Sequence, residues 1–263
     1  MIVQQLGDGR LWCINQTSHA QQAEDLCRHW GNADFARPEP YGPVMVGISQ
    51  HDNGWYEWET APEVRTDGHP MDFVHGPHWS AKIDLWWRGI RRAFDQHPYA
   101  GVLVGHHAAL LYVQMLERVP DLDPDERAAI GAFVEQQAGV WTEARRLLGG
   151  DRRLAPALAD EAIEANARLL QFGDSSSLRL CMPWASGVLG HCPVDGHAGF
   201  TAIDMGFDET TVTYDPWPFA VDRFEVSVWG RVLERSTFAG HDEYRAALAV
   251  APPMLRTWSV ERP

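Results

Sequence analysis

The sequence predicts a mainly α-helical protein that also carries a small antiparallel β-sheet, which makes it α+β overall. Three observations lead to this fold class. Apolar residues recur at helical spacing through most of residues 15–182. Residues 1–14 have the pattern of a β-hairpin, and residues 199–262 change to alternating, β-rich segments. We therefore expect one domain over residues 1–263, in which a helical core is joined by an accessory sheet formed from both ends of the chain.

The helical core is predicted from caps and turn residues as well as from periodicity. Thr17 or Ser18 can cap a first helix that ends at Gly31, and a short apolar helix follows over residues 44–50. Residues 54–77 keep no steady period and are predicted to form a long ordered loop. Further helices are expected over residues 78–94, 99–116, 123–149 and 155–172.

The accessory sheet is predicted from turn chemistry and alternation. Ile2-Val3 and the run from Leu11 to Ile14 flank Gly7-Asp8-Gly9, a strong turn signal. The change of period near residue 199 indicates that the later strands pack with this hairpin as one sheet against the helices. Those strands are expected over residues 200–204, 211–214, 224–229 and 254–260, with a short helix near 242–249.

Composition and charge restrict the class of protein. The net charge is −14 at pH 7, and Lys82 is the only lysine, which argues against a nucleic-acid partner. No apolar run reaches the ~20 residues that a membrane-spanning helix needs, and the N-terminus lacks the pattern of a signal peptide. The four cysteines are scattered and include no CxxC pair. We expect a soluble cytoplasmic protein that has no membrane partner.

Histidines and aspartates in several predicted helices indicate a metal site. His51 and Asp52 are adjacent, so an imidazole and a carboxylate can bind one divalent cation while the second carboxylate oxygen bridges to another. Other helices or helix ends each offer a further candidate. The complete set of predicted ligands is His19, His51, Asp52, His78, His106, His107 and Asp174.

Each candidate ligand also has a structural interpretation. His19 and Asp174 can cap helices, His78 competes with the nearby His75, and a buried histidine in the apolar helix that holds His106-His107 can bond to a carbonyl group. A weaker zinc pattern lies in a Gly-rich segment, where His191-Cys192 is followed by Asp195-Gly196-His197. One cysteine with two histidines and no regular spacing is a weak zinc signal.

The order of the ligands resembles the HD superfamily of metal-dependent enzymes, whose pattern is His, His-Asp and a distant Asp on a helical bundle. The adjacent histidines are similar to those of the HD-GYP phosphodiesterases, and the spacing resembles diiron oxygenases of the myo-inositol oxygenase type. The chain also resembles the DUF3891 family over nearly its whole length. The matching stretches are Gln16–Ala20, His51–Trp55, Asp67–Phe73, Gly105–Ala108, Asp174–Leu178 and Asp215–Phe219.

These resemblances imply an HD-like helical bundle and a centre of two divalent metal ions. His19, His51 and Asp174 would hold one ion, and Asp52 would bridge. His78 and His107 would hold the second ion, with His106 as a further ligand. Iron is the expected metal, and manganese, magnesium and zinc are the alternatives.

Two reactions and one non-catalytic role fit this centre. The expected function is oxidation of a small organic substrate by dioxygen at a diiron site. The alternatives are a metal-dependent phosphohydrolase or phosphodiesterase, and a non-catalytic protein that binds a small ligand. Lys82 lies four residues after His78, so a helix would place both side chains on the same face. There Lys82 could bind an anionic substrate; a solvent-exposed lysine is the structural alternative. Lys82 and Asp52 are the candidate catalytic residues, and Trp55 and Trp58 are expected to line the substrate pocket.

Overall fold

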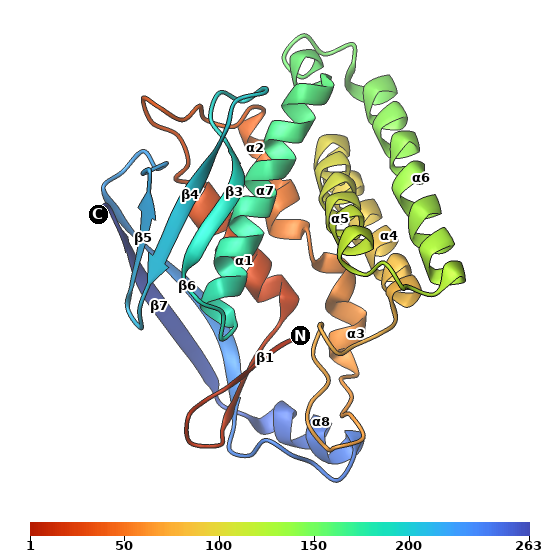
Figure 1. Ribbon diagram of the computed structural model, residues 1–263, viewed down its shortest axis with the longest axis vertical. Coiled ribbons are helices and arrows are strands. Elements are labelled where there is room, and N and C mark those ends of the chain that lie inside the picture. Colours follow the sequence, from red (N-terminus) through yellow and green to blue (C-terminus); the bar gives the residue numbers. More distant parts are fainter.

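The computed structural model describes residues 1–263 and places a group of helices beside one curled β-sheet (Figure 1). The helices are α1 (Gln16–Cys27), α2 (Tyr41–Gln50), α3 (Tyr56–Thr60), α4 (Trp79–Gln96), α5 (Pro98–Arg118), α6 (Pro124–Leu148), α7 (Asp160–Cys181) and α8 (His241–Val250). Two short 3₁₀ helices are η1 (Asn53–Trp55) and η2 (Ala155–Leu158). The strands are β1 (Ile2–Gln5), β2 (Leu11–Ile14), β3 (Gly187–Pro193), β4 (Phe200–Phe207), β5 (Thr211–Asp215), β6 (Arg223–Leu233) and β7 (Pro253–Glu261).

The sheet has seven strands in the order β1-β2-β6-β7-β5-β4-β3. The N-terminal hairpin pairs Ile2 with Ile14, and its second strand joins β6 through the pair Trp12 and Val232. All neighbours are antiparallel except β5 and β7, which run parallel. The N-terminal hairpin and the C-terminal strands therefore belong to one sheet.

The predicted fold class is wrong in the size and type of the sheet. The protein is 49% helical and 20% strand, with a mixed, half-barrel sheet, so it is an α+β fold and not a mainly α HD-like bundle with a small antiparallel sheet. Strand β3 was missed because it is rich in glycine and shifts register between Leu189 and Cys192, which interrupts the alternation of buried and exposed residues. The parallel pairing of β5 with β7 joins segments that are distant in sequence, and local patterns carry no information about it.

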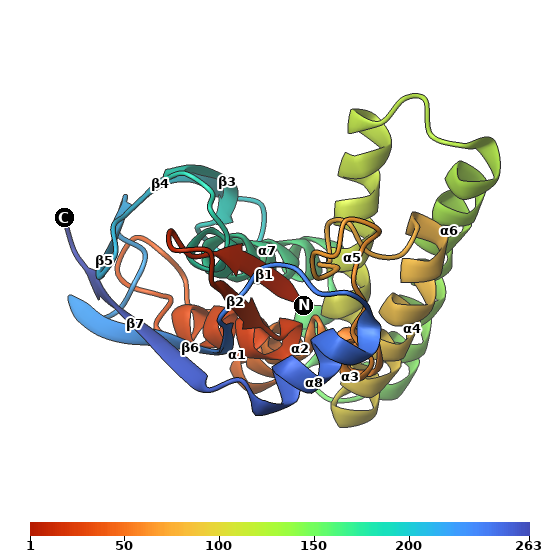
Figure 2. The same cartoon turned by 90° about the horizontal axis from the view of Figure 1, so that it is seen from below.

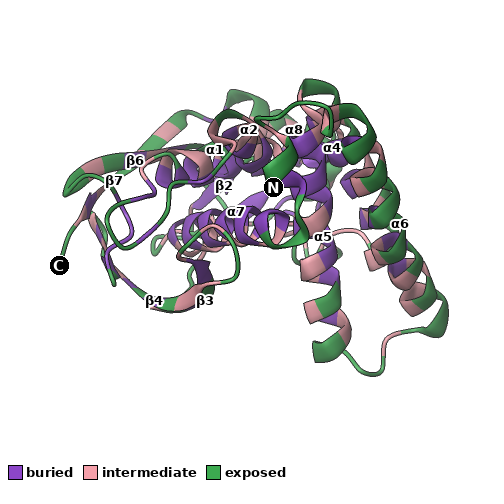
Figure 3. Cartoon of the chain, turned by 90° about the horizontal axis from the view of Figure 1, so that it is seen from above, coloured by how far each residue is buried: buried purple, intermediate pink, exposed green.

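Helices α1 and α7 form the centre of the molecule, where buried residues are concentrated (Figure 3). One hydrophobic cluster contains Trp12 of β2, Leu26 of α1, Phe172 of α7, Tyr214 of β5 and Trp258 of β7. Because these side chains come from three strands of the sheet and from both central helices, the sheet and these helices share one core.

Helices α4, α5 and α6 form the end of the molecule opposite the sheet (Figure 2). They enclose a second cluster that includes Ile90, Tyr112 and Phe133. Helix α5 is long and apolar enough to cross a membrane, but 67% of its most apolar window is buried inside the protein, as in the core helix of a folded domain. The segment over residues 54–77, predicted as a loop, contains part of η1 and all of α3.

Candidate metal centre

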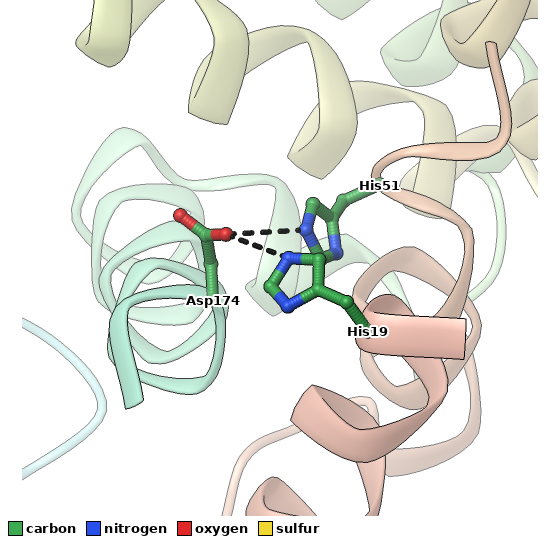
Figure 4. A group of neighbouring side chains, drawn as sticks. All are labelled: His19, His51 and Asp174. Carbon is green, nitrogen blue, oxygen red and sulfur yellow. Dashed lines mark hydrogen bonds and ion pairs between the residues drawn. The ribbon is translucent and has the colours of Figure 1, made fainter. Parts of the chain in front are cut away.

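Three helical segments that are far apart in the sequence bring His19, His51 and Asp174 together (Figure 4). His19 lies on α1, His51 directly follows α2 as its C-terminal cap, and Asp174 lies on α7. One ligand atom from each residue lies within 4.8 Å of the other two. All three side chains are buried, with side-chain exposures of 0% for both histidines and 8% for Asp174.

The two imidazole rings direct their Nε2 atoms at the same carboxylate oxygen. Asp174 Oδ1 lies 3.1 Å from His19 Nε2 and 3.4 Å from His51 Nε2. The Nδ1 atoms face away from the centre: His51 Nδ1 donates to the Ile48 carbonyl at 2.7 Å, and His19 Nδ1 lies 2.7 Å from the Ser177 hydroxyl. Such bonds to the outer nitrogen orient a metal-binding histidine and leave the inner nitrogen free for the ion.

Asp52 and His107 border this group. Asp52 Oδ2 lies 3.7 Å from the Nε2 atoms of both His19 and His51, and His107 Nε2 lies 3.8 Å from Asp174 Oδ2. Both residues are buried. The structure thus brings together five of the seven predicted ligands.

The electrostatics of the metal-free protein show strong coupling in this group. Burial disfavours a charge on His51, but Asp52 and Asp174 outweigh burial and raise the pKa of His51 to about 9. Burial also favours the neutral acid at Asp174, yet contacts from His19 and His51 hold its pKa well below the usual range. The pKa of Asp52 is raised, chiefly by burial, and burial lowers the pKa of His107 to about 3.

The donor set fits a divalent metal ion. His51 Nε2, which faces the centre, is buried and has no hydrogen-bond partner. Unpartnered buried polar atoms are costly, and an imidazole nitrogen beside a carboxylate is a preferred donor for Zn²⁺ or Fe²⁺. A cation between His19, His51 and Asp174 would satisfy the inner nitrogen of His51 and offset the buried negative charge.

Two predicted ligands lie elsewhere. The His78 side chain is 92% exposed and lies 3.9 Å from Glu126. His78 is the N-cap residue of α4, and its backbone is not helical (φ −53°, ψ 158°), so its side chain does not share the helical face of Lys82. His106 bonds to Glu164 and packs against Trp141, since adjacent residues of a helix point about 100° apart and only His107 faces the centre. His75, the alternative to His78, is exposed and bonded to Asp72.

A cavity of about 490 Å³ opens beside the centre, and Asp52, His107 and Asp174 line it. The rest of its wall is mostly apolar. The apolar lining residues are Trp55, Phe73, Val74, Trp79, Trp86, Leu111, Tyr112, Met115, Val119, Leu178 and Trp184. A cavity of this size with a mostly apolar wall and some polar groups is typical of a small-molecule site.

Lys82 is the buried cation of this cavity. Its side chain donates to the Phe73 carbonyl at 3.0 Å and lies 4.5 Å from the centre of the Trp79 ring. The residue is 7% exposed and forms no ion pair, and burial lowers its pKa. Of the two predicted pocket tryptophans, Trp55 lines the cavity, whereas Trp58 lies behind it and packs edge-on against Trp55 at 5.6 Å.

Several lining residues were missed by the sequence analysis. Trp79 and Trp86 lie three positions before and four positions after Lys82 on α4, and this helical spacing could have placed all three on one face. Ser177 does not line the cavity but contacts His19; it follows Asp174 by three residues on α7 and could have been found in the same way. Tyr112 comes from the buried α5, where its sequence context resembles any core position.

Comparison with known proteins gave one match. The model of a family described as "Protein of unknown function (DUF3891)" matches residues 1–235, which include all five residues of the centre. No curated protein and no solved structure matches the chain.

Proposed function

The chain belongs to the DUF3891 family, as its resemblance predicted, and we propose that it is a metal-dependent oxygenase that oxidises a small organic anion with dioxygen. One observation carries this proposal: two imidazoles and one carboxylate from three separate helices converge beside an apolar cavity. Two histidines and one carboxylate with open positions are the ligand set of many non-haem iron oxygenases.

His19, His51 and Asp174 would hold the ion. A bound iron would supply redox chemistry with dioxygen, and the residues around it would control access and charge. The sequence predicted two ions, with His78 and His106 among the ligands. Both of these residues lie elsewhere, so we propose one ion, held by His19, His51 and Asp174. A second ion would have only Asp52 and His107 as further donors.

The cavity residues have separate roles in this proposal. The aromatic wall, which includes Trp55, Trp79 and Trp86, would exclude water from the reaction. Lys82 would bind the anionic group of the substrate, because it is a buried cation with no carboxylate partner. Asp52, which lines the cavity and has a raised pKa, would accept or donate a proton.

A second candidate function is hydrolysis of a phosphate ester, and Lys82 is the observation that favours it. A lone buried cation beside two carboxylates and their metal is a suitable arrangement for a phosphate group. The order His19, His51-Asp52, Asp174 also supports a proposal that the family is a branch of the HD superfamily. We further propose a cytoplasmic location, because all four cysteines are buried free thiols.

Metal content and a dioxygen surrogate test the proposal. We expect protein purified without added metal to contain iron by elemental analysis, and to give an iron–nitrosyl EPR signal when nitric oxide is added without air. Asp174→Asn should lose the iron and the signal, whereas Asp121→Asn, an exposed aspartate on the α5–α6 connection, should keep both. Mn²⁺-dependent turnover of p-nitrophenyl phosphate that Lys82→Met abolishes would instead support the hydrolase. Protein that binds neither metal would refute both.

A further inference from the structure

A second hollow of about 230 Å³ lies on the outer side of α7, and its polar wall is cationic. We call it the arginine groove. Its charged or ionisable lining residues are Arg118, Arg168, Arg179 and His191. No aspartate or glutamate lines it, although the protein has a net charge of −14. The charge of this hollow is therefore opposite in sign to the net charge of the protein.

Three separate elements build the groove. Arg118 ends α5, Arg168 and Arg179 come from α7, and His191 comes from β3, on the other side of α7 from α5 (Figure 1). On α7 the lining positions recur every three or four residues, so they share one helical face, which differs from the face that carries Asp174. These α7 positions are Arg168, Gln171, Phe172, Ser175 and Arg179.

The positive charge of the groove is only partly neutralised within the protein. Arg168 Nε donates to Glu164 at 2.6 Å, and its Nη1 donates to Gln171 at 2.8 Å. Arg179 donates to the carbonyl groups of Ala185 and Val188, which orient its guanidinium without offsetting the charge. Arg118 forms no ion pair. At least two guanidinium charges thus remain available to a ligand.

The backbone beside the groove is strained at His191. This residue has a φ of +55°, and it is the only residue other than glycine with a positive φ. It lies in the register shift of β3, where Cys192 is buried in the core and His191 points outward. This arrangement separates the two residues of the weak zinc pattern and leaves His191 in the wall of the groove. Such bulges and outliers are concentrated at binding sites.

We propose that the arginine groove binds the phosphate group of a small organic phosphate. Guanidinium groups match the oxygen geometry of phosphate, and the two arginines without a carboxylate partner, Arg118 and Arg179, line this hollow from two separate helices together with His191. Arg118 and Gln114 also line the cavity of the metal centre, so the two hollows adjoin. The proposal needs no metal and does not depend on the reaction at the centre.

Calorimetric titration of metal-free protein with inorganic phosphate tests this assignment. We expect one saturable site per chain. Arg118→Gln should weaken binding about tenfold, because it removes a charge-assisted contact. His191→Gly should weaken it several-fold without a cost in folding, since glycine tolerates the positive φ. The matched control is Arg152→Gln, which removes an exposed arginine outside the groove and should leave the affinity within about twofold.

Absence of saturable binding would overturn the proposal, and so would equal weakening by Arg118→Gln and Arg152→Gln. A longer probe, 4-phenylbutyl phosphate, distinguishes an organic phosphate from free inorganic phosphate as the ligand of the groove. If it binds more tightly than inorganic phosphate and loses that gain in Trp184→Ala, one molecule spans both hollows. Equal affinity for both probes assigns the groove to free phosphate. The centre's own variant, Asp174→Asn, should not change the affinity of the metal-free protein for inorganic phosphate, because Asp174 does not line the arginine groove, so failure of the proposed function would leave this test intact.

Discussion

At the scale of single residues, the centre depends on atoms that face away from it. The carbonyl of Ile48 fixes the ring of His51, and Ser177 lies against the outer nitrogen of His19. The Ser177 hydroxyl also contacts Gln22 at 2.7 Å, so the histidine is held through a buried polar network. Preorganised rings lose little entropy when they bind an ion, which favours tight and selective coordination.

Removing the shared carboxylate should remove the metal. Asp174 is the residue that contacts His19, His51 and His107 together, so Asp174→Asn should weaken metal affinity by more than about 100-fold. Asp52→Ala should also lower the bound metal, because its carboxylate faces both inner nitrogens. A chelator competition assay would measure both variants against Asp121→Asn. Full occupancy in Asp174→Asn would contradict the assignment of the centre.

Metal binding should release about one proton from His51 near pH 7. The pKa of His51 is raised to about 9, so its ring is protonated in the metal-free protein and must become neutral to bind an ion. The stabilisation of the metal-free fold by this charge is complete below the unfolded pKa of about 6.5 and is lost as pH rises through about 9. Metal affinity should therefore rise between these values. Calorimetry in two buffers with different ionisation enthalpies would count the protons, and a count of zero would refute the assignment.

At the scale of elements, the centre is positioned by close backbone contact between η1 and α4. A Cβ atom on Gly54 would lie 1.9 Å from the Leu85 carbonyl oxygen, and one on Gly89 would lie 3.1 Å from the Gly54 nitrogen. The pair of glycines lets η1 approach α4 closely. This contact places Asp52, which precedes η1, and Trp55, which ends it, in the wall of the cavity that Lys82 of α4 also lines.

Gly54→Ala should therefore separate two elements of the site. We expect it to lower the free energy of unfolding by about 1–3 kcal/mol through overpacking, and to weaken metal binding as Asp52 moves. Gly139→Ala is the matched control, because nothing lies within 4 Å of a Cβ at this position on α6. That variant should gain up to about 1 kcal/mol from helix propensity. Urea denaturation would compare the two, and equal stability would contradict the role of Gly54.

At the scale of the whole molecule, the sheet and the helices depend on one another. Strand β2 from the N-terminus pairs with β6 from the C-terminal half, and β7 lies in the middle of the sheet. Trp12 and Trp258 from these strands share a cluster with Leu26 and Phe172 of the helices. Loss of either end of the chain would expose the core of the other.

This shared core predicts one cooperative unfolding transition. Far-UV circular dichroism reports the helices, and tryptophan fluorescence reports the clusters on both sides of the molecule, so their denaturation midpoints should coincide. The measurement is a urea titration followed by both signals on the metal-free protein. Two separated midpoints would indicate that the helical part and the sheet fold independently.

Residue type and position on a helix were enough to predict five residues of the candidate site. His19, His51, Asp52, His107 and Asp174 were chosen for their donor chemistry and their place on helices, and the structure brings them together. His78 and His106 were chosen in the same way and lie elsewhere. The direction of the side chain distinguishes the two groups: His78 precedes its helix, and His106 points about 100° away from His107 around α5, toward Glu164.

The sequence by itself determined the approximate ends of most helices, the N-terminal hairpin and the residue types of the centre, because caps, turns and periodicity act over a few residues. The helix predicted over residues 155–172 is an exception, because α7 continues through Asp174 to Cys181. Only the tertiary structure decided that β3 joins the sheet, that β5 and β7 run parallel, and that three arginines surround one hollow. These features depend on contacts between residues tens of positions apart. These contacts form because the whole core packs together, and the residue pattern of a short segment does not predict them.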